Sequence, residues 1–281
     1  MVREQKVRAD GYSVFWVISA PMNRAKLMEG YKALGLEDHC PNERTDYDSL
    51  SDAYKEMYPG KDYDIVPRAN RQRDGVEVIH IKRGGNGQAN GYELTVACRV
   101  VDQKVEVIEG QTDLPRLQEL YAAAKAIVTP NSVGSSIVAV VGHAKGTALR
   151  PTGGFYWVPE DALAMFKGVE AVLTTAVAGE GRTDIYAMSL QMTVDTARAV
   201  RDGLMAEILA ETRKIADEID SGECGEQALA NRKARAMALE AKVSEYEKIL
   251  GEALPTLTAA CEEAQKLAFA AMMKVQQPTA A

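Results

Sequence analysis

The sequence contains few of the residues that build metal centres and nucleophilic active sites. It has three histidines and four cysteines in 281 residues. The cysteines, Cys40, Cys98, Cys224 and Cys261, are far apart and form no CxxC pair, whereas structural zinc sites need closely spaced ligands. We therefore expect no metal site and no cofactor, and scattered thiols of this kind are typical of a reduced, cytoplasmic protein.

Long apolar runs are also missing. No segment approaches the roughly 20 apolar residues of a membrane span, and the charged stretch 1–10 lacks the apolar core of a signal peptide. The net charge of -7 disfavours a general nucleic-acid-binding protein, whose phosphate contacts need clustered Lys and Arg. We expect a cytoplasmic protein with no membrane partner.

The most regular feature lies in the last third of the chain, where apolar residues recur every seven positions. One row runs Leu229, Ala236, Val243, Leu250, Leu257, Ala264 and Ala271, and a second runs three residues on, Leu239, Tyr246, Ala253, Ala260 and Leu267. Such a heptad seam is typical of a helix that packs lengthwise against another helix. The candidate residues for self-association or partner binding are Leu239, Val243, Tyr246, Leu250, Leu257 and Leu267.

Residues 195–276 are predicted to form a long helical hairpin, with a turn at 221–225. Pro255 can kink the second helix or start a new one. Because the heptad phase continues across Pro255, one kinked helix of about fifty residues is favoured, roughly 75 Å long. A helix of that length extends beyond a compact domain, so its far end would need a partner.

Residues 10–194 are predicted to form an α+β domain with a mostly antiparallel sheet. A strand is expected at 11–20, and the alternating pattern over 76–108 predicts a meander of three strands. Short Val-rich runs at 136–141 and 169–177 are also interpreted as strands.

Two segments contain residues that could bind a small ligand or a nucleic acid. The loop 142–147 contains His143 and Lys145, the best-placed polar pair for a small ligand, but Gly146 separates Lys145 from Thr147 and breaks the phosphate-loop spacing. A basic cluster flanks the glycine-rich segment 84–91 and comprises Arg68, Arg71, Arg73, Lys82 and Arg83. It predicts a nucleic-acid contact or, more simply, a solvated sheet edge.

Taken together, these features favour a non-enzymatic structural or adaptor protein with no catalytic residues. It would self-associate, or bind a protein partner, through its C-terminal helices. An acidic, cytoplasmic protein without chemistry motifs also fits a phage or bacterial accessory protein. The alternative is a nucleic-acid-associated accessory protein that uses the basic cluster. A third hypothesis is an enzyme that uses the loop with His143 and Lys145.

Overall fold

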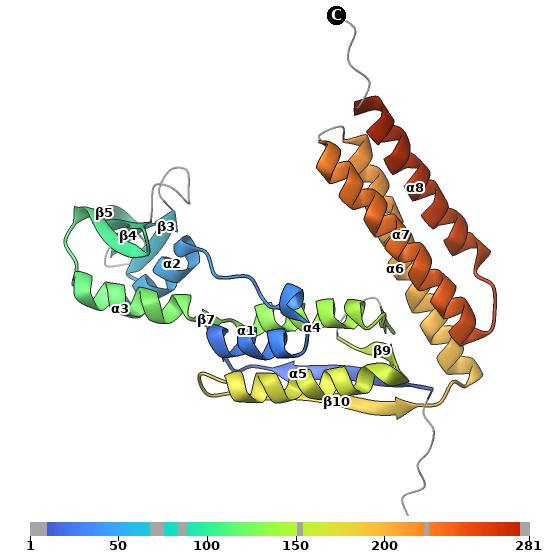
Figure 1. Cartoon of the computed structure of the whole chain (residues 1–281). Helices are drawn as coiled ribbons and strands as arrows, with labels where there is room; N and C mark the ends of the chain where they lie inside the picture. Colours follow the sequence, from blue (N-terminus) through green and yellow to red (C-terminus); the bar gives the residue numbers. More distant parts are fainter. Residues whose placement is uncertain (1–9, 68–75, 84–88, 151–153, 222–224, 276–281) are drawn as a thin grey trace, which may run out of the picture. The chain divides into compact units, whose positions relative to one another are not determined.

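The structure is a computed structural model that describes residues 10–67, 76–83, 89–150, 154–221 and 225–275 (Figure 1). The chain is α+β, about 58% helical and 23% strand, with antiparallel sheets, which confirms the expected class. Packing divides it into two compact units. The sheet unit comprises residues 17–137 and 168–184, and the bundle unit comprises 1–16, 138–167 and 185–281. The expected division into 10–194 and 195–276 stays a prediction.

The sheet unit is built around a four-stranded antiparallel meander with two helices packed against it. The strands follow chain order across the sheet: β3 (Tyr63–Pro67), β4 (Val76–Arg83), β5 (Ala89–Val101) and β6 (Lys104–Gly110). The helices are α2 (Asp46–Met57) and α3 (Leu114–Lys125). Their shared core includes the fully buried Tyr54, Val78 and Leu117. The meander over 76–108 is confirmed, and β3 adds an edge strand, where Pro67 is tolerated.

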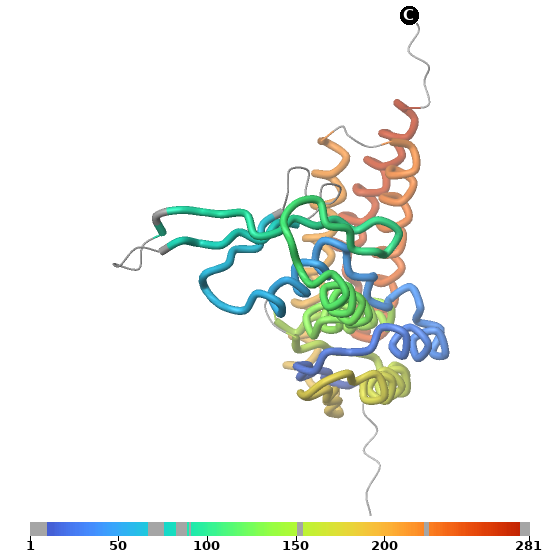
Figure 2. The backbone as a smooth tube through the Cα atoms, turned by 90° about the vertical axis from the view of Figure 1, so that its left-hand side faces the viewer, coloured from blue at the N-terminus to red at the C-terminus, as the bar shows by residue number. Residues whose placement is uncertain are grey.

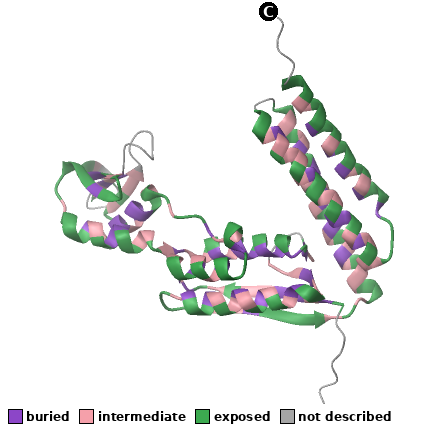
Figure 3. Cartoon of the chain, viewed as in Figure 1, coloured by how far each residue is buried: buried purple, intermediate pink, exposed green. Residues whose placement is uncertain are grey.

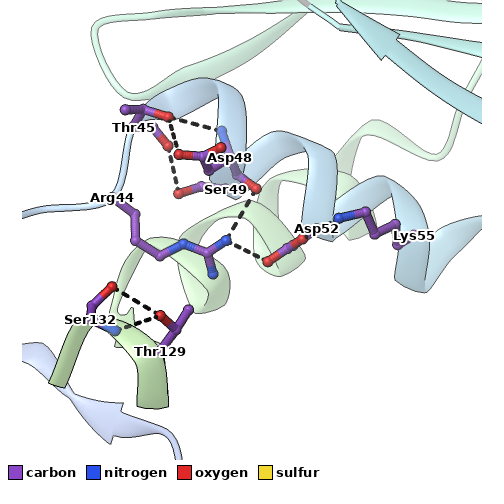
Figure 4. Close-up of polar contacts among 8 residues, drawn as sticks. All are labelled: Arg44, Thr45, Asp48, Ser49, Asp52, Lys55, Thr129 and Ser132. Atoms are coloured by element: carbon purple, nitrogen blue, oxygen red, sulfur yellow. Dashed lines mark hydrogen bonds and ion pairs between the residues drawn. The ribbon is translucent and has the colours of Figure 1, made fainter. Parts of the chain in front are cut away.

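The start of α2 is fixed by side chains that cap it (Figure 4). The hydroxyl oxygen of Thr45 accepts a hydrogen bond from the backbone amide of Asp48 at 3.1 Å, in the usual N-cap geometry. Arg44 pairs with Asp52 one turn further along the helix. From α3, Lys125 donates to the carbonyl oxygen of Arg44 at 2.6 Å and to the carboxylate of Asp46 at 2.7 Å. The two helices are therefore tied together at this end.

The rest of the sheet unit consists of short elements. They are β2 (Met22–Asn23), paired with β7 (Ile127–Val128), then α1 (Arg24–Ala33) and the 3-10 turn η1 (Glu37–His39). Tyr31 of α1 is fully buried, and its hydroxyl lies 2.8 Å from the hydroxyl of Ser136. The second half of α5 (Leu163–Ala176) packs so closely on α1 that a Cβ at Gly30 would lie 2.3 Å from Val172.

The other four-stranded sheet has the order β10-β1-β9-β8. Its strands are β1 (Gly11–Ile18), β8 (Thr147–Ala148), β9 (Tyr156–Pro159) and β10 (Thr183–Leu190). Residues 11–14 of β1 pair antiparallel with 156–159 of β9. The strand expected at 11–20 is thus confirmed. The turn η2 (Glu160–Ala162) leads from β9 into α5.

The strands expected at 136–141 and 169–177 are wrong. Both runs lie in helices, α4 (Pro130–His143) and α5 (Leu163–Ala176). The buried positions reveal the helical period, with Val133, Ile137 and Val140 in α4 and Val169, Leu173 and Ala176 in α5. Because apolar residues also occupy the other faces of these helices, a short window shows an unbroken apolar run. Such a run does not distinguish a buried strand from a buried helix.

The C-terminal region is a three-helix bundle rather than a two-helix hairpin. Its helices are α6 (Val194–Asp220), α7 (Glu226–Leu250) and α8 (Pro255–Val275). They lie side by side along their lengths, and α6 contacts both of the others (Figures 1 and 2). The continuous helix across Pro255 is wrong. Gly251 ends α7 in the left-handed conformation, with φ at 67°, and Pro255 begins α8, where its missing N–H leaves no helical bond unmade.

Candidate functional site

The heptad residues chiefly hold the bundle together. Val243, Tyr246 and Leu257 are at most 1% exposed and lie in a core that they share with residues of α6. Leu239 and Leu250 are half-buried against the same core. The seven-residue spacing continues across the break at Gly251 because both helices present these positions to one core. Of the six residues predicted for association, Leu267 has the most exposed position, at 36%.

A different set of apolar side chains faces outward from α7 and α8. Met237 is 52% exposed, Leu267 36%, Phe269 53% and Met273 46%. We call these four residues the outer face. Figure 3 shows α8 buried along one side and exposed along the other. Phe269 and Met273 lie four positions apart on one side of α8, and exposed apolar side chains that gather in this way mark interaction sites more often than isolated ones do.

Contacts between α7 and α8 fix how the outer face is assembled. Gln265 donates to the carboxylate of Glu240 at 2.7 Å, and the ammonium of Lys233 lies 5.3 Å from the ring centre of Phe269. These contacts run in opposite chain directions, so the two helices are antiparallel. Met237 lies one turn after Lys233 on α7. It therefore belongs to the same side of the hairpin as Phe269.

Charged residues accompany the apolar ones on α8 in a segregated order. Glu262 and Glu263 lie in its middle, and Lys266 and Lys274 lie further toward its C-terminal end. All four are exposed, and Glu262 and Lys266 form a loose ion pair at 3.6 Å. Along the exposed side of α8, acidic residues in the middle of the helix are therefore followed by basic residues toward its C-terminal end.

The loop with the predicted ligand residues is an anchor for α7. The hydroxyl of Tyr246 donates to the carbonyl oxygen of Lys145 at 2.6 Å, and the ammonium of Lys242 donates to the carbonyl oxygen of Gly146 at 2.7 Å. The side chain of Lys145 extends to Glu245 at 2.5 Å. His143 is exposed in the last turn of α4. The structure thus pairs the ammonium of Lys145 with a carboxylate of α7.

Burial and nearby carboxylates keep Tyr246 a hydrogen-bond donor. Burial raises the pKa of its hydroxyl far above the ordinary value for tyrosine, and the negative charges of Glu207 and Glu245 raise it further. The raised pKa keeps the phenol in its protonated, hydrogen-bond-donating form at neutral pH. Its hydrogen bond to the carbonyl of Lys145 does not titrate.

A partly buried ion pair completes this anchor, and sequence reasoning missed it. Lys242 is 9% exposed, and its ammonium lies 2.6 Å from the carboxylate of Glu207 on α6. The other oxygen of that carboxylate accepts the hydroxyl of Thr147 on β8 at 3.1 Å. A signal was present in the sequence, because Lys242 stands directly before the seam residue Val243 in the middle of a predicted buried face.

A groove of about 780 Å³ lies beside this anchor, between α6 and the end of α4. Its walls include Val138, Val141 and Leu149 on one side and Ala199 and Ala206 on the other. The charged residues of α6 that line it already have partners, since Glu207 pairs with Lys242 and Glu211 with Arg235. Its lining is mostly apolar, and its charges do not select a ligand class.

The basic cluster is only partly visible. Arg68, Arg71 and Arg73 lie outside the described residues, and Arg83 ends β4. Lys82 forms an ion pair with Glu93 at 2.7 Å on the neighbouring strand. Of this cluster, the structure therefore shows one side chain, and that side chain faces a carboxylate.

Metal sites and membrane-spanning helices are both absent from the described part of the chain. No group of three or more His, Cys, Asp or Glu side chains is placed there to hold a metal ion. No helix in that part is long and apolar enough to cross a membrane. The thiol of Cys261 is buried in the bundle, and burial, together with the charge of Glu240, raises its pKa to about 11. A thiol in this state is a packing residue rather than a nucleophile.

The chain belongs to a family of unknown function, DUF6744, whose profile matches residues 11–277. No curated protein and no solved structure matches it. The match covers both compact units, so the family is defined by the sheet unit and the bundle together.

Proposed function

We propose that this chain is a non-enzymatic structural or adaptor protein that binds another protein, a second copy of itself first of all, through its C-terminal helices. The observation that supports the proposal is the outer face of Met237, Leu267, Phe269 and Met273. Large apolar side chains that remain about half-exposed on two packed helices suit coiled-coil-like association with further helices.

The internal packing of the bundle strengthens this proposal. Most of the heptad seam is buried within the chain, so the exposed apolar residues are not needed to hold α6, α7 and α8 together. Phe269 is the strongest anchor, because aromatic side chains dominate the energy of protein interfaces. The proposal extends to a cytoplasmic accessory protein of a phage or bacterium, for which composition is the support.

The mass of the protein in solution tests the proposal. We expect the wild type to be larger than a monomer by light scattering, with a mass that rises with concentration. Phe269→Glu places a charge in the outer face and should shift the protein toward monomer. Met188→Glu is the matched control, since Met188 is 47% exposed on β10, away from these helices. A wild type that stays monomeric at the highest attainable concentration contradicts self-association.

Nucleic-acid contact by the basic cluster stays an alternative hypothesis. The described contacts give no observation in its favour, because Lys82 and, on β5, Arg99 both face carboxylates. A gel shift that weakens steeply with salt would support it over protein association.

A further inference from the structure

One helix of the bundle has an exposed side that complements itself. Cys261, Ala264 and Ala268 face the core of the bundle and are at most 2% exposed. The opposite side of α8 carries Glu262, Glu263, Lys266, Leu267, Phe269, Met273 and Lys274, all of them exposed. Acidic residues come first and basic ones follow, with the large apolar side chains among the basic residues.

We propose that two copies of the chain pair through α8 in antiparallel orientation, about a two-fold axis that passes between Leu267 and Ala268. This inference rests on the proposed function and names the partner and its register. A two-fold axis makes the interface isologous, so every contact occurs twice.

The register follows from the charges and the apolar residues together. About this axis, Lys266 faces Phe269 of the other copy, and Glu262 faces Met273. The ammonium of Lys266 then lies over an aromatic ring, a favourable contact. Lys274 lies within one helical turn of Glu262 and Glu263 of the other copy. Opposite charges therefore meet at both ends of the contact, with the apolar side chains and the two Lys266 side chains between them.

Parallel pairing of the same surfaces is disfavoured. In that orientation Glu262 and Glu263 would face their own copies, and Lys274 would face Lys274. Like charges at short distance oppose association. The sequence of charges along α8 thus selects the antiparallel arrangement.

The contact is small, so the dimer should be weak. The 21 residues of α8 span about 31 Å, and only the second half of its exposed side is apolar. Such a patch is at the low end of specific interfaces, below about 1,200 Å² in total. We expect a dissociation constant in the micromolar range, measurable by sedimentation equilibrium.

Charge reversal tests the register. The double variant Glu262→Lys/Glu263→Lys makes the exposed side of α8 uniformly basic and should weaken dimerisation at least tenfold. Lys266→Glu/Lys274→Glu makes it uniformly acidic, with the same expectation. The variant with all four reversals restores opposite charges at both ends and should dimerise nearly as well as the wild type. Glu29→Lys/Glu180→Lys, on exposed positions of the sheet unit, controls for net charge.

The outcomes separate this inference from the proposed function. Rescue by the fourfold variant supports antiparallel pairing. A dimer whose dissociation constant is unchanged in both double variants overturns the antiparallel register while leaving self-association intact, because in a parallel pair like charges face each other before and after either reversal. A monomeric wild type overturns both proposals. Circular-dichroism melting curves of each variant confirm that the bundle is folded.

Discussion

The two compact units use polar residues in opposite ways. In the sheet unit, the charged contacts lie at the periphery, where Asp46 accepts hydrogen bonds from Tyr121 and Lys125 at 2.7 Å each. In the bundle unit, charges lie inside, where Lys242 and Glu207 join α7, α6 and β8. The contacts of Asp46 add to the stability of packed helices, whereas the pair of Lys242 and Glu207 determines which surfaces of α6, α7 and β8 pack together. The bundle should therefore tolerate substitution at its contacts less well than the sheet unit.

The largest effect should come from Leu257→Asp in the bundle. Leu257 is 1% exposed, so the substitution removes a buried apolar side chain and leaves a charge without a partner. We expect a loss of about 4 kcal/mol or more in the free energy of unfolding, measured by urea titration. Leu267 lies on the same helix but is 36% exposed, so Leu267→Asp should lower the free energy of unfolding by less than about 1 kcal/mol. Equal effects would mean that the core does not contain Leu257.

Breaking the internal ion pair should have the next largest effect. Lys242→Met leaves Glu207 partly buried without its cation, which typically costs about 3–5 kcal/mol. Replacing both partners, as Lys242→Met/Glu207→Leu, should recover most of that loss, because no charge then stays unpaired. Urea titration of the two single variants and the double variant gives the coupling. Independent, additive effects would show that Lys242 and Glu207 do not act as a pair.

A cap in the sheet unit should matter less. Thr45→Ala removes the hydroxyl that accepts the amide of Asp48 and should cost about 1 kcal/mol. Thr45→Ser keeps the oxygen and serves as the control. A loss of stability as large in Thr45→Ser would show that the methyl group, rather than the cap, is responsible.

The smallest effect should be the contribution of the Asp46 carboxylate to stability as the pH is lowered. Burial tends to raise the pKa of Asp46, but hydrogen bonds from Lys125 and Tyr121 outweigh it, so the pKa is lowered. A lowered pKa means that the carboxylate stabilises the fold above about pH 4, its unfolded value, and that this contribution is lost as the pH falls through the folded pKa. Stability measured between pH 6 and pH 3 should fall less in Asp46→Asn than in the wild type. Parallel curves would refute a role for Asp46.

Periodicity predicted the local elements well where the surroundings are simple. The alternation over 76–108 identified a half-buried sheet, and the seven-residue spacing located the bundle. It failed for 136–141 and 169–177, because helices that are apolar on several faces hide their period. The seven-residue spacing also predicted one continuous helix in place of α7 and α8, because the spacing continues across the break at Gly251.

The candidate site was harder to predict than the fold. The seam residues were found, but their partner is within the chain. No local pattern reveals that α6 and α8 cover Val243 and Tyr246, because that depends on contacts between segments distant in sequence. The outer face consists of what this packing leaves exposed. Phe269 and Met237 could be recognised only once the buried side of each helix was known.

The anchor between α7 and the loop after α4 has a consequence for sequence variation. Tyr246 and Lys242 donate hydrogen bonds to backbone carbonyl oxygens, which are present whatever the side chain. The side chains of this loop can therefore differ among relatives without loss of the hydrogen bonds that hold α7. The constraint that persists is conformational, since Lys145 has φ at 56°, a region where glycine or asparagine would fit more comfortably.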